Sequence, residues 1–243
     1  MIHPLTLSRK ALRIAKIYGE KVLQCIKPST ITPPSAHMSI LNNELGLSSS
    51  ITAGRPVAAD GSPIPWYTYP AIEYLNQLNA VDLKIFEYGC GNSSLYWARK
   101  GAHVWSVEHS SEWHEQFSAQ SLSPNNILLR QGKHSYAQAI HEQDEVFDII
   151  IIDGVWRNDC CREALKRIRH DGIIILDNSD WYADVAATLR ENNLFQIDFN
   201  GFGPINNYCW TTSIFLPLVS HLTKRIRYPV PIGGITTDKG EMW

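Results

Sequence analysis

The residues with the clearest potential for chemistry form a glycine turn after a short apolar stretch. Glu87 lies near the end of that stretch, Gly89 and Gly91 follow it, and Ser93 begins a helical pattern. Glycines at such a turn let the backbone approach a ligand closely. A helix N-terminus suits a phosphate, but a carboxylate just before the turn repels a diphosphate and suits a cationic amino-acid ligand. The turn therefore predicts a site for a positively charged ligand.

Acidic side chains also end three later apolar stretches. Glu108, Asp153 and Asp177 each follow such a stretch, and Asn178 comes directly after Asp177. Glu108 lies about 20 residues beyond Gly89, the separation at which nucleotide-binding α/β folds place a carboxylate for ribose hydroxyls. Ligands of open α/β sheets bind beyond the carboxyl ends of the strands. We therefore expect these polar side chains to lie near the glycine turn.

Strand and helix patterns alternate along the chain, which is typical of a parallel sheet with helices between its strands. Consecutive isoleucines within 145–154 indicate burial on both faces, as expected for a central parallel strand. A turn rich in Gly, Pro and Asn joins 194–199 to 208–216 and predicts a hairpin. The predicted strands cover 84–87, 103–109, 126–130, 145–154, 172–178, 194–199 and 208–216.

Length and composition limit the classes to which the chain can belong. Its 243 residues suffice for one α/β domain with an extension. The net charge of -2 lacks the basic character of most nucleic-acid-binding domains, so we expect no nucleic-acid partner. The five cysteines have neither zinc-site nor disulfide-scaffold spacing, which favours a reducing cytoplasm. No apolar run approaches the roughly 20 residues of a membrane span.

The two ends of the chain differ in composition from the centre. Residues 5–27 predict an amphipathic helix with basic residues away from its apolar side. Such a helix can bind an anionic membrane surface peripherally, or pack on the domain or on a second subunit. The Pro-, Ser- and Gly-rich segment 28–65 predicts a connection. We divide the chain into an N-terminal extension, 1–65, a catalytic domain, 66–217, and a C-terminal tail, 218–243.

The pattern E-x-G-x-G-N-S at 87–93, with Glu108 and the terminal hairpin, resembles the class I S-adenosylmethionine-dependent methyltransferases. The resemblance covers about residues 66–217. It implies an α/β fold, a Rossmann-like three-layer αβα sandwich with helices on both faces of the sheet. It also implies a mostly parallel sheet in the order 3-2-1-4-5-7-6, with the last strand inserted antiparallel.

The same resemblance assigns roles to residues around the turn. It implies that S-adenosylmethionine is the cofactor, that Glu108 binds its ribose, and that Asp153 lies at the reacting centre. The methionine end would be held by Glu87, Gly89, Gly91, Asn92 and Ser93, and the adenine would lie near Gly132 and Lys133. Aromatic residues before the first strand would cover the cofactor or, alternatively, pack in the core or a subunit contact: Trp66, Tyr67 and Tyr69.

Asp153, Asp177 and Asn178 also resemble the metal ligands of the catechol and caffeoyl-CoA type O-methyltransferases. This resemblance implies a site for Mg²⁺ or another divalent cation, which prefers oxygen ligands. Those enzymes carry a Lys where this chain has Trp156, and the next residue, Arg157, is suited to positioning an acidic or hydroxylated substrate. Alternatively, Asp153 contacts the donor or acceptor directly, and Asp177 and Asn178 cap the next helix.

Methyl transfer to a hydroxyl also requires removal of its proton, by a general base or with the help of a metal. Without a metal, His109, His114 and His134 are candidate bases because each follows the carboxyl end of a predicted strand. The catalytic candidates are Asp153, Arg157 and His109.

The predicted function is methyl transfer from S-adenosylmethionine to oxygen on a small molecule or saccharide. Trp156 and Trp181 flank the expected acceptor site and could stack on a flat or sugar ring, although core packing explains them equally well. One alternative is an NAD(P)-dependent dehydrogenase on a Rossmann sheet. Another is a binding protein that keeps the cofactor without turnover and is recruited by its basic N-terminal helix.

Overall fold

The computed structural model describes residues 34–120, 126–226 and 232–233. The chain divides into two units, Met1–Ser39 and Ile40–Trp243. Of the first unit, only the short helix α2 (Pro34–Ser39) is described. The predicted helix 5–27, with its membrane or subunit contact, lies outside the described residues and stays a prediction. All further observations concern the second unit.

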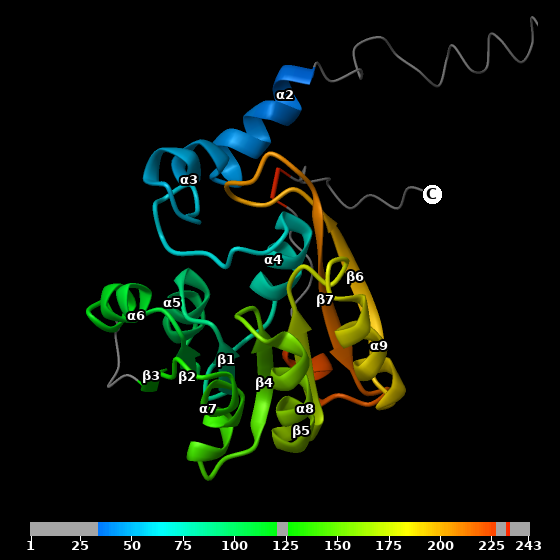
Figure 1. The fold of residues 1–243 in the computed structure, drawn as a ribbon. Coiled ribbons are helices and arrows are strands. Elements are labelled where there is room, and N and C mark those ends of the chain that lie inside the picture. Colours follow the sequence, from blue (N-terminus) through cyan, green and yellow to red (C-terminus); the bar gives the residue numbers. More distant parts are fainter. Residues whose placement is uncertain (1–33, 121–125, 227–231, 234–243) are drawn as a thin grey trace, which may run out of the picture. The chain divides into compact units, whose positions relative to one another are not determined.

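A seven-stranded sheet forms the centre of the second unit (Figure 1). Its order is β3-β2-β1-β4-β5-β7-β6. Neighbouring strands are parallel except around β7, which pairs antiparallel with β5 and β6. The strands are β1 (Lys84–Tyr88), β2 (His103–Glu108), β3 (Asn126–Leu129), β4 (Phe147–Ile152), β5 (Ile168–Leu176), β6 (Phe195–Gly201) and β7 (Trp210–Leu216). The predicted strand order and the antiparallel insertion are confirmed.

Side-chain alternation along the central strands gives the sheet two buried faces. In β4, Ile150 and Ile152 belong to one core cluster, whereas Ile149 and Ile151 belong to the other. Helices α7 (Lys133–Gln138), α8 (Arg157–Arg167) and α9 (Ala183–Glu191) contribute to the first cluster. Helices α4 (Tyr69–Asn76) and α5 (Asn92–Arg99) contribute to the second. Helices therefore cover both faces, as the predicted three-layer sandwich requires.

The other helices of the sheet region are short. Helix α6 (Ser111–Ser118) follows β2, and its N-cap Ser110 accepts a hydrogen bond from the amide of Trp113 at 3.3 Å. The 3₁₀ turn η3 (Ala139–Glu142) continues from α7. In the described part of the chain, no helix combines the length and apolar composition needed to cross a membrane.

Part of the predicted connecting segment 28–65 is helical. Ile40–Glu44 forms the π-helical turn η2, and Leu47–Ala53 forms helix α3. The buried hydroxyl of Ser50 donates to the carbonyl of Val57 at 2.8 Å and accepts from the amide of Val57 at 3.0 Å. These two bonds hold the following loop against α3. A polar contact of this kind leaves no hydrophobic periodicity in the sequence, so the pattern of 28–65 does not predict the helix.

Two boundaries near the bottom of the sheet also differ from the prediction. The predicted strand 172–178 begins earlier, because β5 starts at Ile168, which pairs with Phe147 of β4. The predicted tail 218–243 begins with a packed 3₁₀ turn, η4 (His221–Arg225), in which Leu222 is buried. Ser220 anchors this turn because its hydroxyl donates to the carbonyl of Asp171 at 2.7 Å.

Candidate functional site

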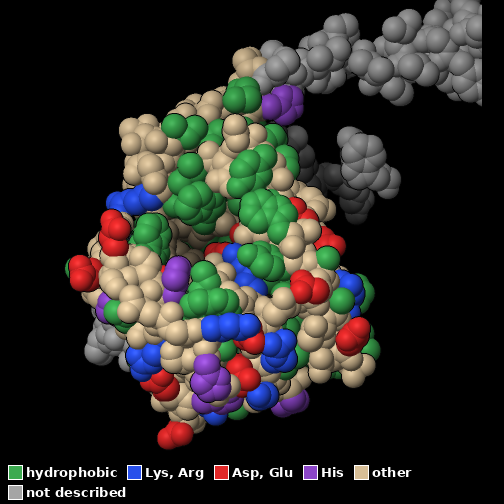
Figure 2. Space-filling model, in the orientation of Figure 1, with side chains coloured by type: hydrophobic (Ala, Val, Ile, Leu, Met, Phe, Trp, Pro, Cys, Tyr) green, Lys and Arg blue, Asp and Glu red, His purple; other side chains and the backbone are tan. Residues whose placement is uncertain are grey.

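The carboxyl ends of β1, β2, β4 and β5 open into one cavity of about 760 Å³. Its lining combines the glycine turn after β1 with Glu108, Asp153 and Asp177. Figure 2 shows a hollow on this face of the molecule, bordered by hydrophobic side chains. The structure thus brings together the acids that the sequence places at the ends of separate strands.

The glycine turn packs against the turn that follows β4. Gly89 has a φ of +94°, and a Cβ at this position would lie 3.2 Å from the Cα of Gly154. A Cβ at Gly154 would lie 2.0 Å from the hydroxyl oxygen of Tyr136. Glycine is therefore needed at both positions. As a result, bare backbone from two neighbouring strand ends lines this part of the cavity.

Glu87 is the most buried acid of the turn, with 1% of its surface exposed. The hydroxyl of Ser94 donates to its carboxylate, and the amide of Gly91 donates to the same Ser94 hydroxyl at 3.1 Å. Burial raises the pKa of Glu87 to about 8, although the hydrogen bonds from nearby serines oppose the rise. Ser94 therefore fixes the acid to the turn, a role that the sequence pattern alone did not indicate.

Glu108 is held rigidly at the end of β2. One carboxylate oxygen accepts from the amides of His109 and Ser110, each at 2.8 Å, and the other accepts from the amide of Cys90 at 3.1 Å. The Nδ1 atom of His109 lies 2.9 Å from the first oxygen. The second oxygen keeps acceptor capacity for a ligand hydroxyl. His109 lines the cavity beside Glu108, on the side expected for the ribose.

Arg157, the first residue of α8, joins the ends of β4 and β5. Its guanidinium donates to the carbonyls of Gly154 at 2.9 Å, of Asp153 at 3.2 Å and of Asp177. It also donates to the Asp153 carboxylate at 3.0 Å, and it lies 4.4 Å from the ring centroid of Tyr182. The side chain is 8% exposed. It serves the protein scaffold, which does not support the predicted contact with a substrate.

Asp153 combines a fixed partner with access to the cavity. Its Oδ1 atom accepts from Arg157, and 23% of the side chain remains exposed. Within the described residues, Oδ2 has no hydrogen-bond partner. Burial raises the pKa of Asp153 to about 6, while the charge of Arg157 opposes the rise. The carboxylate is therefore suited to accepting a proton near neutral pH.

Asp177 is turned toward the protein interior. Its Oδ1 atom accepts from the indole of Trp210 at 3.0 Å and from the hydroxyl of Thr212. Burial, reinforced by the charge of Asp153, raises the pKa of Asp177 well above its usual range. The carbonyl of Asn178, and not its side chain, accepts from the amides of Trp181 at 2.8 Å and Tyr182 at 3.2 Å.

The predicted divalent-metal site at Asp153, Asp177 and Asn178 is not supported by this geometry. The Arg157 guanidinium already provides a positive charge beside Asp153, and Trp210 and Thr212 bind Asp177. No group of three or more His, Cys, Asp and Glu side chains in the described ranges is arranged to hold a metal ion.

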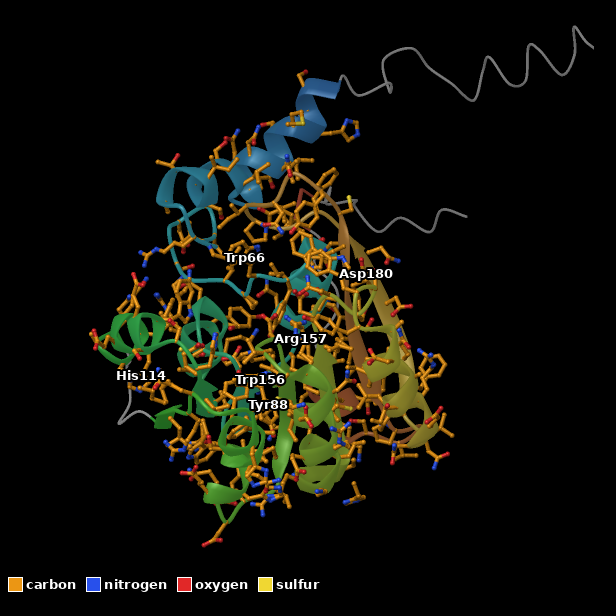
Figure 3. The ribbon with its side chains drawn as sticks, viewed as in Figure 1. Trp66, Tyr88, His114, Trp156, Arg157 and Asp180 are labelled. Carbon is orange, nitrogen blue, oxygen red and sulfur yellow. The ribbon has the colours of Figure 1, made fainter. Side chains whose placement is uncertain are left out.

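Several predicted site residues lie elsewhere. Gly132 is the N-cap of α7, and Lys133 pairs with Asp159 of α8 at 2.7 Å; neither lines the cavity. Trp156 packs on the ring of Tyr136, with centroids 5.5 Å apart. The ring of His114 bonds the carbonyl of Ile127 at 2.9 Å, and Figure 3 shows it well to the side of Arg157. His134 does not line the cavity either.

Aromatic residues from distant segments complete the lining. Trp66 lines the cavity, whereas Tyr67 and Tyr69 are buried in the core, so the expected cofactor cover is reduced to one of the three residues. Trp181 also lines it, as predicted. Other lining residues belong to no motif in the sequence; those from α6, the β6–β7 turn and the start of β7 include Trp113, Asn206, Tyr208 and Trp210.

The sequence matches no protein-family model and none of the curated proteins with which it was compared. Among solved structures, it is similar to a candidate caffeoyl-CoA O-methyltransferase from Staphylococcus aureus, with a TM-score of 0.51 and 16% identity over 84% of this chain and 99% of the other. It is also similar to a spermidine synthase from Thermotoga maritima, with a TM-score of 0.48 and 13% identity over 63% of this chain and 59% of the other. A third similar structure is a precorrin-6y C5,15-methyltransferase from Geobacter metallireducens, with a TM-score of 0.47 and 12% identity over 61% of this chain and 87% of the other. The strand order and the first of these likenesses show that the chain has the Rossmann-like α/β fold found in methyltransferases.

Proposed function

We propose that the protein transfers a methyl group from S-adenosylmethionine to an oxygen atom of a small-molecule or saccharide acceptor. The observation that carries the proposal is the convergence of Glu87, Glu108 and Asp153 on one cavity beside the Gly89 turn. A sulfonium amino acid brings two positive charges, which buried acids favour. The ribose hydroxyls of the same molecule match the remaining acceptor capacity of Glu108.

The same lining disfavours a dinucleotide. A diphosphate at the glycine turn would disfavour the ionised form of the Glu87 carboxyl group, whereas a cationic ligand would favour it. Arg55 is the only Lys or Arg among the described lining residues, and its guanidinium reaches Gln120 at 3.5 Å. Arg157 is occupied by the strand ends. The dehydrogenase alternative therefore has only Arg55 as a lysine or arginine for its diphosphate in the described lining, together with several acids.

Asp153 is suited to accept the proton of an acceptor hydroxyl. In the proposed step, the hydroxyl oxygen attacks the methyl carbon in line with the C–S bond. The O–C bond forms, the C–S bond breaks with its electron pair going to sulfur, and the proton passes to Oδ2 of Asp153. The donor becomes a neutral thioether. Arg157 holds Oδ1 at 3.0 Å and thereby orients the base.

We expect the purified chain to bind S-adenosylmethionine and S-adenosylhomocysteine and to ignore NAD⁺ and NADP⁺. Calorimetry and thermal unfolding test this, because a ligand at 100 times its Kd stabilises a protein by about 2.7 kcal/mol. Gly89→Ala should weaken binding at least tenfold, since its Cβ would meet the Gly154 backbone at 3.2 Å. Gly61→Ala is the matched control: Gly61 also has a positive φ, but nothing surrounds its Cβ position. If the chain bound a dinucleotide but neither S-adenosylmethionine nor S-adenosylhomocysteine, the proposed function would be overturned.

We also expect cofactor binding to release a proton at pH 7. With a pKa of about 8, Glu87 is mostly protonated in the free protein, and a cationic ligand should ionise it. The binding enthalpy should then differ between phosphate and Tris buffers. The release should disappear above about pH 9, where Glu87 is already ionised, and in Glu87→Gln. A buffer-independent enthalpy at pH 7 in the unmodified chain would contradict this role of Glu87.

A further inference from the structure

Four aromatic side chains at the cavity are unusually exposed. One of them, Trp113, donates its indole N–H to the carbonyl of Cys90 in the glycine turn, and the other three lie on other segments. Trp66, Trp181 and Tyr208 have exposed fractions of 39%, 58% and 44%. They come from the segment before α4, the turn after β5 and the β6–β7 turn. Large aromatic rings that are exposed to water are typical of surfaces that a ligand covers. Figure 2 shows hydrophobic side chains gathered around the hollow. In Figure 3, Trp66 and Asp180, the residue before Trp181, both lie above Arg157.

The rings of Trp181 and Tyr208, together with the neighbouring ring of Trp210, form a surface and not a slot that could enclose a flat ligand. Trp181 and Tyr208 have centroids 6.0 Å apart at an interplanar angle of 37°, and Tyr208 and Trp210 are 5.9 Å apart at 61°. A flat ring inserted between two others needs about 7 Å, twice the contact distance of roughly 3.5 Å between carbon atoms. Tyr208 thus contacts both Trp181 and Trp210. Trp181 and Tyr208 offer a ligand their exposed rings, and Trp210, which is only 3% exposed, supports Tyr208 from the protein side. We call these three residues the aromatic platform.

Two neutral amides, Asn206 and Asn178, are among the polar groups near the aromatic platform. Asn206 accepts from the indole of Trp66 at 3.1 Å, which leaves its amide NH₂ group to donate to a ligand. Asn178 also lines the cavity. The basic lining residue Arg55 is directed at Gln120. An anionic acceptor would therefore find Arg55 as the one Lys or Arg of the described lining, together with several acids, whereas hydroxyl groups would find both donors and acceptors.

The aromatic platform is also connected to the proposed reacting centre. Trp210 donates from its indole to Asp177 at 3.0 Å. Asp177 ends β5 next to β4, whose end carries Asp153. A ring lying on the platform would therefore extend toward the carboxylate that accepts the proton. A six-membered sugar suits this arrangement, because its C–H face packs on aromatic rings while its edge carries hydroxyls.

We propose that the exposed rings of Trp181 and Tyr208, supported by Trp210, hold a neutral pyranose ring as the methyl acceptor, with Asn206 and Asn178 binding its hydroxyls. This inference rests on the proposed methyl transfer and narrows its acceptor to one class. A flat aromatic acceptor would use only one of its faces here, and an anionic one would meet the acids of the cavity. The acceptor site also differs from the cofactor turn in its residues, so the two can be tested separately.

The test is saturation-transfer NMR on the full chain with methyl glycosides of glucose, galactose, mannose, rhamnose and xylose, with and without S-adenosylhomocysteine. Catechol and a primary amine, benzylamine, serve as competing probes. We expect transfer to the ring protons of at least one glycoside. Trp181→Ala and Tyr208→Ala should each weaken its binding roughly tenfold, in line with an aromatic contact of about 1.4 kcal/mol.

Phe195→Ala is the matched control, because Phe195 on the edge strand β6 is 60% exposed and does not line the cavity. It should leave glycoside binding unchanged. All three variants should bind S-adenosylhomocysteine as the original chain does. Transfer only to catechol or benzylamine, or equal glycoside binding in every variant, would overturn the acceptor assignment. Loss of cofactor binding in the unmodified chain would instead overturn the proposed function, whatever the glycosides do.

Discussion

Replacing Asp153 by Asn is expected to lower kcat by roughly 10²–10⁴-fold, the usual contribution of a general base. The measurement is methyl transfer from labelled donor to a hydroxylated acceptor that the unmodified chain accepts. Asn keeps the shape of the side chain and an oxygen that can accept from Arg157, now 3.0 Å from Oδ1. The loss would therefore report the missing base and not a displaced strand end. S-adenosylhomocysteine affinity should change far less than kcat.

The pH dependence of kcat is a second test of Asp153 as the general base. The carboxylate is the active form of Asp153, whose pKa is raised to about 6 by burial. Activity should fall as the pH drops through about 6 and level off above it, and Asp153→Asn should lose this limb. Asp148→Asn is the control, because Asp148 is a buried acid of the same strand, bound to Arg169 at 2.7 Å and outside the cavity. Its kcat per folded molecule should be unchanged. If Asp153→Asn kept the acid limb, His109 would become the leading candidate base.

The sheet was predictable because its signals are local and repeated. The isoleucine run of β4 contains both faces of a buried strand, and the acids at the ends of β2, β4 and β5 mark their carboxyl ends. Once the strand order is known, Glu108, Asp153 and Asp177 must meet at one edge. The hairpin at the end of the chain was predictable for the same reason, since Gly, Pro and Asn interrupt two apolar runs.

The partners of these acids were not predictable, because each depends on a contact between distant segments. Trp210 and Thr212 reach Asp177 only through the antiparallel pairing of β7 with β5, in which Leu176 is opposite Ser213. Arg157 follows Asp153 closely in sequence, yet its bond to the Asp177 carbonyl requires β5 to be next to β4. A metal-ligand pattern and a guanidinium-bridged pair of strand ends share the same acidic residues, and only the geometry distinguishes them.

Replacing Arg157 by Met is expected to lower the free energy of unfolding by about 3–5 kcal/mol, the cost of removing one partner of a buried ion pair. The guanidinium is 8% exposed and satisfies the carbonyls of Gly154, Asp153 and Asp177 as well as the Asp153 carboxylate. Met fills similar volume but offers no donor, so these oxygens would lose their partner. Urea denaturation of both proteins measures the difference.

The loss of unfolding free energy in Arg157→Met should also depend on pH, and the direction of this dependence shows whether the ion pair with Asp153 causes it. The folded-state pKa of Asp153 is about 6, above its usual value of 3.8, so its ionisation already opposes folding as the pH rises through that range. Without Arg157 the pKa should rise further, and the destabilisation should be larger at pH 8 than at pH 5. Arg162→Met is the control, because Arg162 lies on the same helix in an exposed pair with Asp159 and should contribute no more than about 1 kcal/mol. Equal, pH-independent losses in the two variants would show that Arg157 does not stabilise the strand ends electrostatically.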